Sequence, residues 1–480
     1  MSLEPTMKKL VLHTAVAIAV LSAPYAAAAP IQLSEAFNYN AFIFNDFEGQ
    51  YSDVEGRLAV GGEMRVNDFN VGLQLSPQLS DSALLVGKNL HFINGNVHGG
   101  STTVSGMVFG ENLSLDKGIE AEQTINLINS TVKSGNVTSE GDVKLGNSNV
   151  VSGDVHANSV VLGGPAEVYD SRTNEGMFGS KVENGNVSAE SNVTLVKSEI
   201  NGTVTMNSGG TLTTDGESSI GAEVRSEVKK ATVENIQFSA LEEEVRQFSN
   251  DFRDRDINGT TLVESSSKCF DTDGNVVDTQ SQTCAAQGGT EREKVHTITF
   301  KGENDINVFD IDASTLSVAD KSIWYDFTST SYNIINVRGE VVELFNTGFF
   351  NEAYKNFSNT DYFTETGQYA DNAPASSNTP ERRHDGKFTN NILFNFVDAT
   401  NITFHSVGIK GSVLAPYADI SFYNGQVDGN LIAKNLSSPD GEFTGQVNNY
   451  RFGAIDVSEP ASWALLFGAG FLMMARRKKA

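Results

Sequence analysis

The chain is poor in cysteine, in tryptophan and in positive charge. Its 480 residues include 2 cysteines and 2 tryptophans, and 34 Lys and Arg stand against 60 Asp and Glu. Two cysteines cannot form the framework of a disulfide-rich domain. The net charge of -26 argues against nucleic acid and anionic lipid as partners, because both are themselves negatively charged. The hydrophobic share of 39% excludes a disordered chain.

Motifs of catalysis are also missing. The sequence contains no Gly-x-Ser-x-Gly elbow, no His-Glu-x-x-His, no Gly-Lys-Ser/Thr phosphate loop and no Cys-x-x-Cys. His98 and His156 occur in similar Gly-x-Val-His settings, which turn positions explain without a ligand. We therefore expect no enzyme, no cofactor and no catalytic residue. A polysaccharide-degrading β-helix enzyme is the alternative, because the many acidic residues hide any catalytic pair.

The N-terminus carries an export signal. Lys8 and Lys9 precede an apolar stretch at residues 10–21, and small residues at 26–29 offer a cleavage site. This pattern predicts a signal peptide over residues 1–29, with the mature chain beginning near residue 30.

The C-terminus has three parts. A short polar motif comes first, then an apolar transmembrane segment at residues 461–475, then a basic stop. The motif consists of Val457, Ser458, Glu459 and Pro460, and the stop of Arg476, Arg477, Lys478 and Lys479. Because the basic residues stay on the cytoplasmic side of the membrane, the chain before the transmembrane segment is expected on its outer side.

Residues 457–480 resemble the PEP-CTERM sorting signal of Gram-negative bacteria, with Ser458 in place of the first proline of the usual Pro-Glu-Pro. The resemblance implies recognition by an exosortase-type membrane protease. It also implies transient inner-membrane anchoring through the tail and delivery to the cell surface or extracellular matrix. An ordinary single-pass anchor is the alternative.

Glycine is abundant, with 44 residues, and it recurs in a motif of Gly, a polar residue and Val or Leu. The motif begins at Gly56, Gly95, Gly135, Gly153, Gly185, Gly202, Gly411, Gly425, Gly429 and Gly445. Several neighbouring copies lie 17 to 20 residues apart, and alternating strand-like sequence follows them. Such a unit cannot bury its apolar side chains alone, so stacking is expected. We predict a mainly β chain that forms an irregular parallel β-solenoid (β-helix) over residues 30–456, with a β-sandwich as the alternative.

Residues 232–254 break the β pattern. Apolar residues recur there every three or four positions, at Val233, Ile236, Ala240, Leu241, Val245, Phe248 and Phe252. This spacing predicts one amphipathic helix. We expect the helix to cover the flank or an open edge of the solenoid.

Cys269 and Cys284 flank an Asp-Gly turn. In an exported protein they are predicted to form one disulfide that closes a hairpin over residues 269–284. Asp271, Asp273, Asn275 and Asp278 resemble the start of a calcium loop, but the Glu of an EF-hand is missing and a plain turn is favoured. Residues 361–387 are polar and contain two prolines, which predicts a mobile excursion from the stack.

Two blocks resemble the choice-of-anchor A domain of bacterial surface proteins. The first comprises residues 40–47 and 52–62, including Ser-Asp-Val-Glu-Gly-Arg-Leu-Ala-Val-Gly-Gly, and the second comprises residues 409–420 and 424–434. The resemblance implies a surface or matrix protein with an adhesive role, and some relatives are described as collagen-binding. The order of β block, helix and β block is also similar to that of bacterial ice-binding solenoids, which supports a right-handed solenoid with a flanking helix.

The function expected from these features is structural or adhesive, at the cell surface or in the extracellular matrix of a biofilm. Exopolysaccharide or matrix protein is the expected partner. Ice binding is a further alternative, because Thr-x-Thr strings occur at residues 203–205, 211–213 and 297–299. Ordinary β-propensity explains these strings equally well.

Overall fold

The computed structural model describes residues 31–79, 81–169, 176–233, 237–273, 276–277, 284–355, 368–369 and 388–453. The expectation of a mainly β chain is confirmed: most strands belong to one large sheet, and five form a second. The predicted signal peptide, sorting motif, transmembrane segment and basic stop lie outside the described residues, as does nearly all of the predicted excursion at 361–387. Within the described ranges, no helix combines the length and apolarity needed to cross a membrane.

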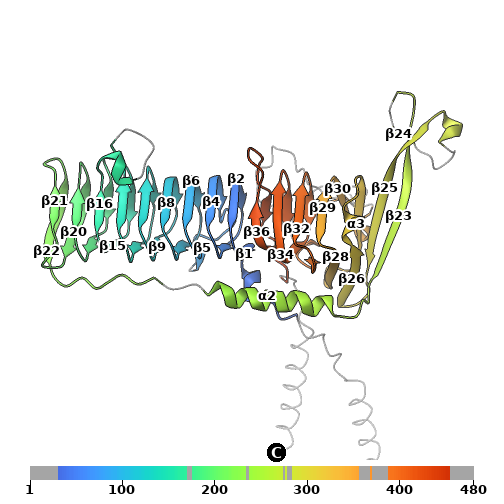
Figure 1. Ribbon diagram of the computed structural model, residues 1–480, viewed down its shortest axis with the longest axis horizontal. Helices are drawn as coiled ribbons and strands as arrows, with labels where there is room; N and C mark the ends of the chain where they lie inside the picture. The colour runs from blue at the N-terminus through green and yellow to red at the C-terminus, as the bar shows by residue number, and fades with distance from the viewer. Residues whose placement is uncertain are drawn as a thin grey trace, which may run out of the picture. The chain divides into compact units, whose positions relative to one another are not determined.

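The strands form two blocks, separated by a helix (Figure 1). The first block contains β1 (Ala41–Ile43), β2 (Phe47–Val54), β3 (Leu58–Val60), β4 (Met64–Val71), β5 (Ser82–Val86), β6 (Leu90–Val97), β7 (Ser101–Val104), β8 (Val108–Leu115), β9 (Ile119–Ala121), β10 (Ile125–Ile128), β11 (Thr131–Val132), β12 (Val137–Ser139), β13 (Val143–Gly146), β14 (Asn149–Ser152), β15 (Val155–Ala157), β16 (Val160–Leu162), β17 (Lys181–Asn184), β18 (Val187–Ala189), β19 (Val193–Leu195), β20 (Glu199–Met206), β21 (Leu212–Thr214) and β22 (Ser219–Arg225).

The second block contains β23 (Thr260–Phe270), β24 (Val276–Val277), β25 (Thr290–Lys301), β26 (Ile306–Asp312), β27 (Lys321–Asp326), β28 (Tyr332–Arg338), β29 (Val341–Phe345), β30 (Thr347–Asn351), β31 (Ile392–Phe396), β32 (Asn401–His405), β33 (Gly408–Lys410), β34 (Ser412–Tyr423), β35 (Gln426–Asp428), β36 (Leu431–Ser437) and β37 (Gln446–Asn448). The helical elements are η1 (Glu35–Asn38), η2 (Ala166–Tyr169), α2 (Phe238–Arg253), η3 (Ala285–Gln287), α3 (Ala313–Leu316) and η4 (Glu352–Tyr354).

Strands of the large sheet pair in parallel with the equivalent strand of the next layer. A layer takes 18 residues from Asn136 to Asp154 and 17 from Asp116 to Lys133. The segment that carries η2 lengthens one layer, which explains why the glycine spacing breaks between Gly153 and Gly185. A β-sandwich needs antiparallel neighbours, and among the described ladders antiparallel pairing occurs only at β23.

Aliphatic side chains fill the inside of the stack in rows. One row crosses both blocks with each member opposite the next: Ile409, Val427, Val447, Val54, Val71, Val97, Leu115, Val132, Val150, Val182 and Ile200. Every one of these residues is buried. Since burying one such side chain contributes roughly 1.5–3 kcal/mol, the row is a major source of stability.

Two kinds of corner explain the abundance of glycine and asparagine. At one corner, Asn94, Asn112 and Asn129 adopt positive φ angles of 50–54°, a region that asparagine tolerates. The Asn112 amide donates to Asn94 Oδ1 in the next layer at 2.8 Å. At another corner the backbones stack so closely that a Cβ on Gly153 would lie 2.0 Å from the Gly135 carbonyl oxygen. Only glycine fits there.

After β22 the chain returns along the flank of the stack. An extended segment comes first, in which Val233 N donates to Glu140 Oε1 and Lys229 O contacts His156 Nε2. These contacts hold residues 229–233 extended, so the helix begins at Phe238 rather than at 232 as predicted. Residues of the predicted apolar stripe differ in burial: Ala240 is exposed, whereas Phe252 is buried.

Helix α2 is fixed by polar contacts to the second block and by an aromatic contact to η1. Asn395 receives a hydrogen bond from Ser249 Oγ and donates one to Ser249 O. Asn336 donates to Phe252 O at 2.9 Å. Phe248 packs against Phe37 of η1 with ring centroids 5.2 Å apart. The helix therefore joins the start of the first block to the second block.

The two blocks meet in the middle of the stack, at a seam. Strand β1 pairs with β3 on one side and with β36 on the other, and β2 pairs with both β4 and β37. Buried Asn40 reinforces the seam, since its amide donates to the carbonyl oxygens of Gly429 and Asn448. In Figure 1 the blue and red strands lie side by side at this point.

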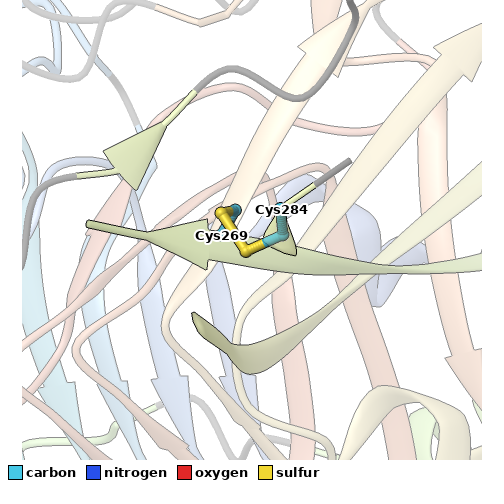
Figure 2. The surroundings of a disulfide bond; sticks show 2 residues. All are labelled: Cys269 and Cys284. Carbon is cyan, nitrogen blue, oxygen red and sulfur yellow. A yellow bond between two sulfur atoms is a disulfide. The ribbon is translucent and has the colours of Figure 1, made fainter. Parts of the chain in front are cut away.

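The second block begins with a long antiparallel pair, β23 and β25, which belongs to the five-stranded sheet. A disulfide joins Cys269 on β23 to Cys284 at the start of η3, with Cα atoms 5.4 Å apart (Figure 2). The bond thus ties η3, which lies in the connection between β23 and β25, to the end of β23.

Candidate functional site

One outer face of the first block carries a row of large polar and aromatic side chains. They come from successive strands in register: Glu48 on β2, Arg65 on β4, His91 on β6, Phe109 on β8, Asn126 on β10 and Lys144 on β13. With strands about 4.8 Å apart, the row extends over about 24 Å. We call this row and the two hollows above it the trough.

The trough consists of two adjoining hollows of about 510 and 330 Å³, both lined by Arg65 and His91. Residues 167–168 of the η2 segment line the larger hollow, and Ser438 and Asp440 line the smaller one. In Figure 1 the η2 segment and the segment between β36 and β37 project at the same side of the stack. The trough therefore has a wall at each end.

The wall formed by η2 is attached to the row itself. Asn126 donates to the Tyr169 carbonyl oxygen at 2.7 Å, and Lys144 Nζ donates to Val168 O at 3.2 Å. The Tyr169 ring is buried, and its hydroxyl shares its one proton between the carbonyl oxygens of Leu145 and Gly163, at 3.0 and 2.9 Å. Burial raises the pKa of this hydroxyl, so it stays protonated. The wall is consequently a fixed part of the site.

The floor combines an aromatic stack with charges of both signs. The His91 and Phe109 rings stack with centroids 4.8 Å apart, and Arg65 Nη2 pairs with Glu63 Oε2 at 2.6 Å. The hydrogen bond from Arg65 lowers the pKa of Glu63, which keeps that carboxylate ionised. A strongly acidic protein thus presents guanidinium, ammonium, carboxamide and aromatic groups together at this place.

Two exposed aromatic rings lie beyond the smaller hollow. Tyr51 and Phe443 are 47% and 58% exposed, and their ring centroids are 5.5 Å apart. The Phe443 segment is fixed to β2, because Gln50 N donates to Thr444 Oγ1 and Gln50 Nε2 donates to Glu442 O. Both rings therefore face solvent on a backbone segment that is held in place.

The structure brings together few of the residues singled out from the sequence. His98 contacts Asp116 at 3.2 Å and His156 contacts Lys229 O, so both contribute to turn or linker contacts. At the calcium candidate, Asp273 N donates to Asp271 Oδ1, as in a simple turn, while Asn275 and Asp278 lie outside the described residues. In the described part of the chain, no group of three or more His, Cys, Asp or Glu is arranged for a metal.

The Thr-x-Thr strings do not form one face. Thr205 lies opposite Ser188 on β18, whereas Thr213 lies opposite Thr194 on β19 and Thr297 belongs to the five-stranded sheet. The trough itself was not anticipated. Its signal in the sequence is the recurrence of large polar or aromatic residues at one position of β4, β6, β8 and β10, which becomes visible once the register is known.

A family model described as "Putative Ice-binding-like adhesive domain" matches residues 32–135 and 124–445, which is most of the chain. The chain belongs to this family. Membership of this ice-binding-like adhesive family supports a surface protein of adhesive type. No curated protein matches the sequence.

Solved structures with some likeness to this family member include the tapirin C-terminal domain of Caldicellulosiruptor kristjanssonii, with 13% identity, 86% of this chain and 93% of that chain covered, and a TM-score of 0.26. An ice binding protein from an Antarctic Flavobacteriaceae bacterium shows 9% identity over 87% of this chain and 97% of its own, with a TM-score of 0.21. A possible adhesin C-terminal domain from Caldicellulosiruptor kronotskyensis shows 9% identity, 91% and 96% coverage and a TM-score of 0.18. At these TM-scores the likeness does not bear on function.

Proposed function

We propose that the protein is a surface adhesive component that binds exopolysaccharide or matrix protein through the trough. The observation that carries the proposal is the row from Glu48 to Lys144, with walls at both ends and exposed aromatic rings beside it. Amide and charged groups can hydrogen-bond sugar hydroxyls and carboxylates, while aromatic rings pack against the apolar faces of sugar rings. Polysaccharide is therefore the partner favoured over protein.

The scaffold proposed for this role is an irregular right-handed parallel β-solenoid. Parallel pairing at intervals of 17 or 18 residues supports it, and parallel β-crossovers are almost always right-handed. Such a scaffold keeps binding groups on consecutive strands at a constant spacing, which suits a repeating ligand.

Binding is tested by co-sedimentation of the protein with purified host exopolysaccharide. The double variants Arg65→Ala with His91→Ala, and Tyr51→Ala with Phe443→Ala, are expected to bind at least tenfold more weakly, a loss of about 1.4 kcal/mol. Leu262→Ala is the matched control, because this β23 side chain is 48% exposed and belongs to the hairpin rather than the trough. Unchanged binding by both double variants would exclude the trough as the binding site.

Two further measurements on the same samples distinguish adhesion from polysaccharide degradation and from ice binding. Falling viscosity or released oligosaccharide on incubation would indicate a polysaccharide-degrading enzyme instead. Thermal hysteresis with shaped ice crystals would indicate ice binding, for which the scattered threonines offer no regular face.

Delivery to the surface is proposed to follow the exosortase route through residues 457–480, from a Gram-negative inner membrane. Its support is the sequence motif alone. Replacing Glu459 and Pro460 with Ala is expected to leave the precursor in the membrane with its tail attached. Normal maturation of that variant would contradict sorting and favour simple anchoring.

A further inference from the structure

Three polar side chains occupy equivalent positions on neighbouring strands of the second block. Lys410 ends β33, Asp428 ends β35 and Asn448 ends β37, and the register places Asp428 opposite both of the others. The Lys410 and Asp428 side chains are 3% and 4% exposed, and Asn448 is fully buried. A buried ion pair adds little net stability, because desolvation offsets the attraction. Stability alone therefore does not account for this cluster.

The Asp428 carboxylate bridges an amine and an amide. Lys410 Nζ lies 2.6 Å from Asp428 Oδ2, and Asn448 Nδ2 donates to Asp428 Oδ1. Asn448 Oδ1 is buried and has no hydrogen-bond partner among the described residues. The hydroxyl of fully buried Tyr325 donates to the Lys410 carbonyl oxygen, which closes one side of the cluster to water.

The Lys410 amine and the Asn448 side-chain amide are the two reactants of an amide exchange. Where water is excluded, the ammonium proton can pass to the adjacent carboxylate, because neither ion is solvated. The product is a neutral amine, which is a nucleophile, beside a carboxylic acid, which is a proton donor. Rotation of the Asn448 amide brings its oxygen to the place now held by Nδ2, where it accepts a hydrogen bond from the acid and its Cγ becomes more electrophilic.

We propose that Lys410 and Asn448 become joined by an isopeptide bond, with Asp428 as the proton carrier. Lys410 Nζ attacks Asn448 Cγ and a new C–N bond forms. The bond from Cγ to Nδ2 then breaks, and Nδ2 leaves as ammonia after Asp428 transfers to it a proton that came from Nζ. Nothing is oxidised or reduced and no further reactant is needed. Lys410 Nζ and the Asn448 amide are held on the two oxygens of one carboxylate. Such fixed positioning of reactants favours intramolecular reactions.

The bond would tie β33 to β37 across β35, directly beside the seam. Because β37 pairs with β2 of the first block, the cross-link prevents the last layer from separating under load. This inference goes beyond the proposed adhesive function and does not depend on the ligand.

Trypsin digestion of the mature protein under denaturing, reducing conditions tests the bond by mass spectrometry. Without it, cleavage after Lys410, Lys434 and Arg451 yields separate peptides 388–410, 411–434 and 435–451. With the isopeptide bond present, trypsin does not cleave after the modified Lys410. Peptide 388–434 is then found attached to peptide 435–451, with the combined mass lower by one ammonia. Free peptide 388–410 together with free peptide 435–451 would overturn the proposal.

The chain contains an exposed control for this chemistry. Lys434 contacts Asp419 at 3.1 Å and Asn435 donates to the same carboxylate, but the Lys434 and Asp419 side chains are 36% and 51% exposed. Since both charges are solvated there, normal cleavage after Lys434 is expected.

Asp428→Asn keeps the side-chain size but removes the proton carrier, so this variant should restore the separate peptides. A loop-linked peptide 388–434 lighter by one water, with peptide 435–451 free, would assign the link to Asp428 and overturn the role given to Asn448.

Discussion

The buried amide of Asn395 makes more of the hydrogen bonds described above for helix α2 than any other side chain. This side chain accepts a hydrogen bond from Ser249 Oγ at 2.6 Å, donates one to Ser249 O at 3.0 Å and donates one to Asn336 Oδ1 at 2.9 Å. Asn395 is fully buried on β31. Replacing it with Ala removes all three hydrogen bonds and leaves their partners without compensation.

The expected cost follows from these three bonds. Each contributes about 1 kcal/mol net, and unpaired buried partners add to the loss, so Asn395→Ala should lower the free energy of unfolding by about 3–5 kcal/mol. With an unfolding entropy of about 2.1 cal/mol/K per residue, a cooperative unit of roughly 200 to 400 residues should melt about 4–12 °C lower.

The assay combines thermal unfolding with hydrogen exchange. Amides of α2 should exchange faster in Asn395→Ala, whereas those of β10 to β14 in the first block should change little. Gln247→Ala is the control on the same helix, because its exposed side chain donates a hydrogen bond to Asp251 one turn away on the helix; the substitution should cost less than about 0.5 kcal/mol. Equal melting of both variants would refute the view that this amide network holds the helix.

Three further predictions concern the core, pH and the disulfide. Leu115→Ala, in the aliphatic row, should cost about 2–5 kcal/mol in denaturant unfolding, and a cost under about 1 kcal/mol would contradict the continuous row. Burial lowers the pKa of Lys321 from 10.5 to about 8, so the Lys321 side chain binds more protons in the unfolded chain between these values and its contribution to stability should rise with pH there. Lys321→Met should flatten that rise in paired denaturation curves, and an unchanged slope would show that Lys321 is not its source. Changing Cys269 and Cys284 to Ser opens a loop with a sequence separation of 15, worth about 3 kcal/mol; proteolysis should then cut the hairpin while the stack melts as before, and a lower melting temperature of the stack would contradict this local role.

The repeating features of the fold could be predicted from the sequence because they recur at fixed intervals. The glycine motifs indicated tight corners, and Gly153 shows why no other residue fits. The helix was visible from Phe248 and Phe252, but its start was not, because the bond from Val233 to Glu140 involves a residue far away in the chain. The trough could not be predicted, since Arg65, His91 and Phe109 become neighbours only through the register of strands separated by loops of unequal length.

The seam has a consequence for how the chain reaches its native state. Asn40 and Gly429 are 389 positions apart, so β1 and β2 find their second neighbours only after almost the whole polypeptide is available. Contacts of such long sequence separation form slowly. During that interval the open edges of β1 and β2 are free to pair wrongly with other chains. We therefore expect secretion helpers that shield nascent β-edges to matter more for the yield of this protein than for a stack assembled in sequence order.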